Sequence, residues 1–169
     1  MGKSGAAALL LDPGSDAAAR AWLQHDLLPR LGDRDFALIV KDQTELVTTI
    51  GADGIHLSDA AALKKLRGKF ADLSIGVSCP LERHDAMIAA ELGADYVAFE
   101  PTDADEALVQ PLIQWWSEMM TVPSVVFAAT PERAQAAVQA GADFIAAPAT
   151  VWLAADPLAE VRRFAQCLG

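Results

Sequence analysis

The sequence has few cysteines, few cations and no long apolar run, and each shortage excludes a class of protein. Its two cysteines, Cys79 and Cys167, lie far apart and match no metal-binding or redox spacing, so we expect reduced thiols. Thirteen Lys and Arg against 23 Asp and Glu give a formal net charge of −10, which repels nucleic-acid phosphates and anionic membrane surfaces. The apolar run from Ala6 to Leu11 is too short for a signal-peptide core or a membrane span. We therefore expect a soluble, cytoplasmic protein with neither nucleic acid nor a membrane as its partner.

What the sequence does contain is a tripeptide, Gly-Ala-Asp, that occurs three times. The copies begin at Gly51, Gly93 and Gly141 and continue as GADGIHLSD, GADYVAFEP and GADFIAAPA. Each copy follows a stretch with helical spacing, and glycine suits the left-handed position just past a helix end. The short apolar run after each copy is typical of a strand covered on both faces, as in a parallel sheet. The repeat therefore predicts helix, turn and strand units in a wound α/β fold.

Seven apolar runs are predicted as strands, and each is followed by a helix or a helical turn. They are residues 6–11, 36–40, the run ending at 56–59, 73–77, 94–99, 122–127 and 144–147. Such units, joined by right-handed crossovers, close at eight strands as a TIM barrel. We predict a single domain over residues 1–169 with seven of the eight units. Either the first βα unit is missing, or the sheet is open or completed by a partner.

Three helix starts can be predicted from capping residues and prolines. Ser15 is a candidate N-cap for a helix that runs to about Leu31. Pro111 cannot lie deep in a helix without removing a hydrogen bond, so we expect a helix that begins at about this residue. Thr130 followed by Pro131 is a third good start, with a capping hydroxyl and proline at the first helical position.

Two adjacent tryptophans, Trp115 and Trp116, point about a third of a turn apart on a helix, so both cannot bury fully in one core. Met119 and Met120 extend the same apolar surface. One interpretation is an association surface, which would make the protein a homo-oligomer. The other is that the pair packs under the loop that begins at Pro101.

Five segments resemble, in order and spacing, those of the thiamine phosphate synthase and TenI family. They are GADGIHLSD, IGVSC at Ile75, ELGADYVAFEP at Glu91, VPSVV at Val122 and AGADFIAAPATVW at Ala140. The family is a (βα)8 barrel whose synthases join a pyrimidine diphosphate to a thiazole phosphate, with magnesium assisting the loss of diphosphate. The resemblance begins at about Ala6 and aligns AAALLLD with the family's second strand, which implies that the first βα unit is missing.

The resemblance implies a ligand-binding site at the carboxyl ends of the strands. Its candidate residues are Lys41, Asp42, His56, Ser78, Ala128 and Ala129. Lys41-Asp42 stands where the family has Asn-Asp, so Asp42 is a possible magnesium ligand. Ser78 could bond a phosphate oxygen, and Ala128-Ala129 replaces a Gly-Gly turn whose amides approach the thiazole phosphate.

A second magnesium ligand is not matched, because HLSDAA places Ala61 at that position and Asp59 two residues earlier. Asp59 is therefore either a displaced ligand or a helix cap. Other site residues also have structural interpretations: Lys41 and Asp42 as an ion pair, and His56 as a hydrogen-bonded core residue. Cys79, which with His84 invites a nucleophile and base interpretation, is more simply a bystander.

Several positive or donor groups of the family's site are replaced. Asp12 and Glu100 occupy positions near the expected diphosphate, no lysine follows Lys69, and Pro148 has no N–H at the last phosphate position. Removing one such donor costs about 3 kcal/mol of transition-state stabilisation. From this count we predict a degenerate active site without synthase activity, in a binder of a small phosphorylated ligand or an assembly partner. The alternatives are an active, magnesium-dependent synthase, a TenI-like thiazole isomerase, or a purely structural subunit.

Overall fold

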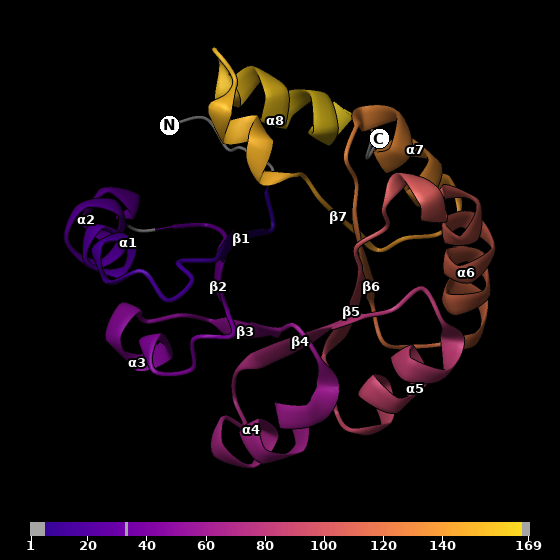
Figure 1. The fold of residues 1–169 in the computed structure, drawn as a ribbon, viewed down its shortest axis with the longest axis horizontal. Helices are drawn as coiled ribbons and strands as arrows, with labels where there is room; N and C mark the ends of the chain where they lie inside the picture. Colours follow the sequence, from indigo (N-terminus) through magenta and orange to yellow (C-terminus); the bar gives the residue numbers. More distant parts are fainter. Residues whose placement is uncertain (1–5, 33, 167–169) are drawn as a thin grey trace.

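A computed structural model describes residues 6–32 and 34–166, and it contains one sheet of seven parallel strands (Figure 1). Neighbours in the sheet are neighbours in the sequence, so every connection is a crossover to the next parallel strand. The strands are β1 (Ala8–Leu11), β2 (Ala37–Lys41), β3 (Gly54–Leu57), β4 (Ser74–Cys79), β5 (Tyr96–Phe99), β6 (Ser124–Phe127) and β7 (Phe144–Ala146).

A helical segment follows every strand, which confirms the predicted TIM-barrel-like repeat of seven βα units. In chain order the segments are α1 (Ala17–Trp22), η1 (Leu23–Leu27), α2 (Leu28–Leu31), α3 (Leu46–Ile50), η2 (Ala60–Ala62), α4 (Leu63–Lys69), α5 (Arg83–Glu91), η3 (Asp103–Asp105), α6 (Glu106–Met119), α7 (Pro131–Gln139), η4 (Ala149–Leu153) and α8 (Pro157–Gln166). None of the helices in the described ranges is long and apolar enough to cross a membrane.

The sheet is curled, and its helices lie on the outer side of the curve (Figure 1). In the part of the chain that the structure describes, β1 pairs only with β2 and β7 only with β6. The two edge strands are therefore not paired with each other. Within the described part of this chain the sheet is therefore open between β1 and β7.

The core lies between the sheet and the helices. Val40, Ile55, Val77, Val97 and Phe99, from four neighbouring strands, are all 0% exposed and belong to one apolar cluster. Successive residues of a strand point to opposite faces. The residues that alternate with these five therefore line the concave side of the sheet, away from the helices.

Each Gly-Ala-Asp repeat ends a helix in the predicted way. Gly51, Gly93 and Gly141 have φ angles of 62°, 95° and 101°, in the region that side chains disfavour. The next residue's N–H then reaches back over the helix end, as in the 3.0 Å bond from Ala52 to the carbonyl of Val47. The prediction that this repeat is a helix-to-strand turn is confirmed.

The aspartate of each repeat binds the strand that precedes it in the sheet. Its Oδ2 accepts a backbone N–H from the start of that strand: Asp53 from Leu38 at 2.8 Å, Asp95 from Ile75 at 2.6 Å and Asp143 from Ser124 at 2.8 Å. We call Asp53, Asp95 and Asp143 the strand clamps. They join β2 to β3, β4 to β5 and β6 to β7 at the amino ends of the strands.

Two of the predicted helix starts are wrong. Asp16, not Ser15, caps α1, because its Oδ1 accepts the N–H of Ala18 at 2.9 Å. Helix α6 begins at Glu106, five residues before Pro111, after a capping box between Thr102 and Asp105. A proline inside a helix costs about 3 kcal/mol. The face of α6 that includes Val109, Leu112, Ile113 and Trp116 is buried, and burial of a large apolar side chain contributes about 1.5–3 kcal/mol, which outweighs this cost.

The two tryptophans lie in different environments. Trp116 is 0% exposed, packs edge-on against Phe99, and donates its Nε1–H to the carbonyl of Val122 at 2.7 Å. Trp115 is half-buried, with the guanidinium of Arg83 lying 4.5 Å from its ring centroid. The pair is therefore a core residue and a residue packed beneath α5. The homo-oligomer prediction gains no support from these rings.

Candidate active site

Four adjacent strands, β2 to β5, place polar side chains on the concave face; three of these lie in the carboxyl-terminal halves of their strands, and Tyr96 lies at the start of β5. In the sheet register Lys41 pairs with His56, His56 with Gly76, and Gly76 with Tyr96. Paired residues of neighbouring strands point to the same side. Ser78 lies two residues further along β4 and therefore shares this face. We call this end of the sheet the rim.

Three of these polar residues, together with Glu100, form a continuous chain of hydrogen bonds. The hydroxyl of Tyr96 lies 3.0 Å from Nδ1 of His56, and Nε2 of His56 lies 2.9 Å from Oγ of Ser78. Ser78 in turn donates to Oε1 of Glu100 at 2.7 Å. The chain joins three strands and leads from the buried His56 to the exposed Glu100.

The direction of every bond in this chain follows from Glu100. A carboxylate only accepts hydrogen bonds, so the single hydroxyl proton of Ser78 goes to Glu100. Ser78 must then accept the Nε2–H of His56, which leaves Nδ1 as the acceptor of the Tyr96 hydroxyl proton. His56 is thus held as the neutral Nε2–H tautomer.

Burial keeps His56 and Tyr96 neutral. His56 is 1% exposed, and desolvation lowers its pKa below the usual 6.5, although the carboxylate of Glu100 at 3.9 Å from Nε2 acts in the opposite direction. Burial also raises the pKa of the Tyr96 phenol. The interpretation of His56 as a buried, hydrogen-bonded residue is correct, and its partners Tyr96 and Ser78 lie on the concave face with it.

Glycine at position 76 makes room for the tyrosine. A Cβ at Gly76 would lie 1.9 Å from the ring of Tyr96, which is far inside van der Waals contact. The Tyr96 ring therefore crosses directly over the β4 backbone to reach His56. The ring of Phe127, at the end of β6, lies 6.0 Å from the His56 ring and is tilted by 55°. Aromatic rings thus border the polar chain.

Lys41 and Asp42 separate in the structure. Nζ of Lys41 lies 3.9 Å from Oδ2 of Asp12, on the neighbouring strand's end. Asp42 adopts a left-handed φ of 53° and accepts two bonds from Ser58, from its N–H at 2.9 Å and its hydroxyl at 2.5 Å. The predicted ion pair between Lys41 and Asp42 is therefore replaced by one between Lys41 and Asp12.

The two candidate magnesium ligands do not converge. Both carboxylate oxygens of Asp42 are bonded to Ser58, and Oδ1 of Asp59 accepts the N–H of Ala61 at 2.7 Å as the cap of η2. Across residues 6–32 and 34–166, no group of three His, Cys, Asp or Glu side chains could hold a metal ion. The residues present thus do not fit a magnesium site, and Asp59 is a helix cap.

Cys79 is not a reactive thiol. It is buried, and burial raises its pKa to about 11. His84 is exposed on α5 and does not orient it. The bystander interpretation of Cys79 is correct, while Cys167 lies outside the described residues.

A second part of the rim is a hollow of about 330 Å³ between the loops that follow β6 and β7. We call it the rim hollow; it is lined by Ala129, Thr130, Pro131, Glu132, Pro148, Thr150, Val151, Ala154, Glu160, Arg163 and Phe164. The hydroxyl of Thr130 caps α7 by accepting the N–H of Arg133. The N–H of Ala128 already donates to the carbonyl of Ala146 at 3.0 Å, so of the two predicted alanines only Ala129 faces this space.

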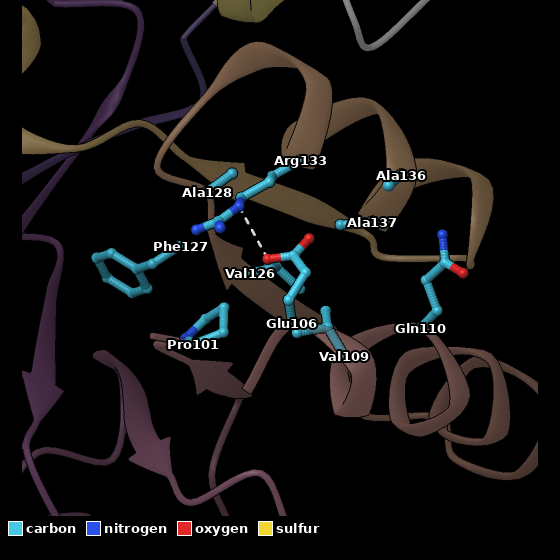
Figure 2. Close-up of a pocket in the computed structure, with 10 residues that line it drawn as sticks. All are labelled: Pro101, Glu106, Val109, Gln110, Val126, Phe127, Ala128, Arg133, Ala136 and Ala137. Atoms are coloured by element: carbon cyan, nitrogen blue, oxygen red, sulfur yellow. Dashed lines mark ion pairs between the residues drawn. The ribbon is translucent and has the colours of Figure 1, made fainter. Parts of the chain in front are cut away.

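A narrower hollow of about 10 Å³ lies between α6 and α7, behind β6 (Figure 2). Figure 2 shows Arg133 turned toward Glu106, and the two side chains form an ion pair of 2.8 Å. Arg133 also pairs with Asp103 at 2.8 Å. This cation is therefore used to join α7 to α6, and the space beside it is too small for a substrate.

The fold and these residues are similar to those of known proteins. Residues 3–151 match the family described as Thiamine monophosphate synthase (TMP-TENI). The chain belongs to this family. The Thiamine-phosphate synthase of Erythrobacter litoralis is 36% identical over 90% of this chain and 76% of its own length. That of Rhodospirillum centenum is 42% identical over 82% of this chain and 72% of its own length.

Solved structures agree on the fold of the family. The Thiamine phosphate pyrophosphorylase from Pyrococcus furiosus has a TM-score of 0.80 at 20% identity and covers 96% of this chain and 82% of its own. The BexX/CysO complex of Amycolatopsis orientalis contains a chain with a TM-score of 0.74 at 17% identity, covering 98% of this chain and 79% of its own. Both likenesses concern the fold alone.

The prediction of a family member without synthase activity is wrong. Relatives 36% and 42% identical over most of the chain are named Thiamine-phosphate synthase, and they favour an active synthase over a degenerate one. The prediction added the replaced donors as if each were independent. It did not include the polar chain on the concave face, which a count of cations does not detect.

Within the family fold, the structure brings together part of the predicted site. His56 and Ser78 are in contact, Lys41 lies beside His56 in the register, and Asp42 faces Ser58 instead. Tyr96 and Phe127 were missed, since an aromatic residue in a strand usually indicates core. The signal for Tyr96 was Gly76, a small residue on the adjacent strand two positions before Ser78.

Proposed function

We propose that this chain catalyses the thiamine-phosphate synthase reaction. A carbon–nitrogen bond forms between the pyrimidine's methylene carbon and the thiazole ring nitrogen, while the carbon–oxygen bond to diphosphate breaks. Diphosphate leaves with the bonding electrons. The observation that carries the proposal is the similarity to synthases at 36% and 42% identity over most of the chain. TIM-barrel enzymes place their chemistry at the carboxyl ends of the strands, where Ser78 and Glu100 of the polar chain lie.

We assign the thiazole phosphate to the rim hollow. Its volume of about 330 Å³ admits a small ligand, and the amino end of the nine-residue helix α7 opens onto it. Thr130 and Thr150 add hydroxyl groups, and Arg163 adds a guanidinium that is ion-paired with Glu160 of the same lining at 3.0 Å. The hydroxyl groups and the amino end of α7 are the features that support placing a small phosphorylated ligand here.

We assign to Lys41 the task of neutralising negative charge on the departing diphosphate. It is the cation on the concave face next to His56, and its side chain is 24% exposed. A positive charge placed where negative charge develops is worth about 3 kcal/mol in a closed site. Because the described carboxylates do not form a magnesium site, no step of this proposal passes through a metal.

The test is an assay for thiamine phosphate by mass spectrometry, with both substrates present and with magnesium either added or chelated. We expect product, and we expect Lys41→Met to reduce its rate about a hundredfold. Lys64→Met, which changes an exposed lysine on α4, is the matched control and should leave the rate unchanged. The proposal fails if the folded protein gives no product under either condition.

We also propose a cytoplasmic location and a homo-oligomeric state. The free thiol of Cys79 suits a reducing compartment. Leu108 and Met119 on α6 are 54% and 64% exposed and could pack against a second copy. Sedimentation equilibrium over a hundredfold concentration range tests the oligomer, and a monomer throughout would contradict it.

A further inference from the structure

We propose that Glu100 selects the ring that enters the rim by accepting a hydrogen bond from an amino group on a heteroaromatic substrate. The inference rests on the proposed function, and it assigns the pyrimidine to this part of the site. Glu100 follows β5 directly and stands at the outer end of the polar chain.

Glu100 has acceptor capacity left after its bond within the protein. Oε1 accepts the Ser78 hydroxyl, and the side chain is 44% exposed. A carboxylate offers about four acceptor positions on its two oxygens. The other positions therefore face solvent at the rim, where a ligand can reach them.

The polar chain offers no donor beside Glu100. The proton of Ser78 is directed to Glu100, and the Nε2–H of His56 is directed to Ser78. The outward end of the chain is thus an acceptor with a negative charge. A phosphate, which is itself a charged acceptor, is unfavourable there, whereas an N–H donor is favourable.

The surroundings favour a flat ring as the carrier of that donor. Phe127 lies at the end of the next strand, with its ring 6.0 Å from that of His56. Aromatic faces attract a second ring by offset or edge contacts. An amino-substituted pyrimidine combines the ring with the donor. A thiazole phosphate brings a ring without an amino group, so we place it by its phosphate in the rim hollow.

The test separates the ring from the phosphate. The probes are an unphosphorylated 4-aminopyrimidine alcohol and the same compound with a methyl in place of the amino group, both titrated calorimetrically into the full chain. A hydrogen bond to a charged group predicts binding of the amino compound about tenfold to a hundredfold tighter. Equal affinities, or no binding of either probe at millimolar concentration, would overturn the inference.

Variants identify the group responsible. Glu100→Leu should remove the preference for the amino compound, and Glu100→Gln, which keeps an oxygen acceptor without charge, should reduce it to about threefold. Glu106→Gln is the control, since this carboxylate pairs with Arg133 behind β6, and it should keep the full preference (Figure 2). A preference that persists in Glu100→Leu would contradict our assignment.

The two proposals fail in different ways. Product formation by a protein that binds both probes equally would reject the role of Glu100 and keep the synthase reaction. A clear preference for the amino compound without any product, in the same preparation, would reject the reaction and keep a site for amino-substituted rings.

Discussion

The two ends of the sheet are built differently. At the amino ends, the same arrangement occurs three times. A left-handed glycine ends a helix, and the aspartate two residues after it accepts a backbone hydrogen bond from the preceding strand. Toward the carboxyl ends, His56 on β3, Ser78 on β4 and Glu100 after β5 are different polar groups that, with Tyr96 from the start of β5, form a single chain of hydrogen bonds. Repetition suits a task that is the same at each strand, such as fixing strand register.

This difference between the two ends of the sheet agrees with the general pattern in barrel folds. Residues at the amino end of the strands mainly affect stability, and residues at the carboxyl end carry chemistry. If this division holds here, changes at the clamps should lower stability without altering catalysis per folded molecule. Changes at the rim should lower catalysis per folded molecule without lowering stability. The exception is a change that disturbs the packing of the polar chain against the sheet.

The largest effect on stability should come from Gly76→Ala, because the rim chain is packed against the β4 backbone. The added Cβ would lie 1.9 Å from the Tyr96 ring, so the ring must move and its bond with His56 is lost. Overpacking of this kind costs up to about 3 kcal/mol. The free energy of unfolding in urea measures it.

Gly68→Ala is the matched control. Gly68 lies in helix α4, and a Cβ there would meet nothing within 4 Å. Alanine should stabilise this helix position by about 0.5–1 kcal/mol. If Gly76→Ala were as stable as the wild type, the Tyr96 ring would not occupy the place that the structure gives it.

The second effect concerns the strand clamps. Asp95→Ala removes the acceptor for the N–H of Ile75 and the partner of Arg67, and we expect a loss of about 1–2 kcal/mol. Glu91→Ala, at an exposed position in the last turn of α5, should change stability by less than about 0.5 kcal/mol. Product formed per folded molecule should be unchanged in both, and a large fall in Asp95→Ala would contradict the division between the two ends.

Salt distinguishes the clamps from one another. Asp53 and Asp95 also form ion pairs with Arg34 and Arg67, whereas Asp143 is bonded to the hydroxyl and N–H of Ser124. At 1 M salt the screening length falls to about 3 Å. The loss caused by Asp53→Ala or Asp95→Ala should therefore shrink at high salt, by up to about 1 kcal/mol, while that of Asp143→Ala stays constant.

The amino end could be predicted from the sequence because its signals are local. Glycine, alanine and aspartate act on a helix end and a strand start that are adjacent in the chain, so three copies define the turn. The clamp bonds themselves span 15 to 20 residues, and the sequence indicated the aspartates without indicating their partners.

The rim was predicted only in part because its bonds are long-range. His56 and Ser78 were expected in the site, but the bond between His56 and Tyr96 spans 40 residues and depends on the register of three strands. Glu100 was interpreted as a sign of lost function, because the sequence shows its negative charge but not its hydrogen-bond partners. Once its partner Ser78 is known, the same carboxylate sets the direction of the whole chain.

The smallest predicted effect on stability is its pH dependence near neutral pH, which we attribute to His56 at the rim. Burial lowers the pKa of His56 in the folded protein below 6.5, so the unfolded chain binds a proton more readily. The stabilisation from a neutral His56 is therefore fully present above pH 6.5 and is lost progressively as the pH falls below it. Asp53, whose pKa the N–H of Leu38 and the Arg34 guanidinium lower below 3.8, loses its contribution only at more acid pH.

Unfolding free energies between pH 8 and pH 5 therefore separate the two ends of the sheet. His56→Gln, which keeps polar groups but cannot titrate, should have a flatter profile than the wild type over this range. His25→Gln changes an exposed histidine and should keep the wild-type slope. The same slope in His56→Gln and the wild type would mean that His56 is solvated, and the tautomer that Glu100 imposes through Ser78 would then not exist.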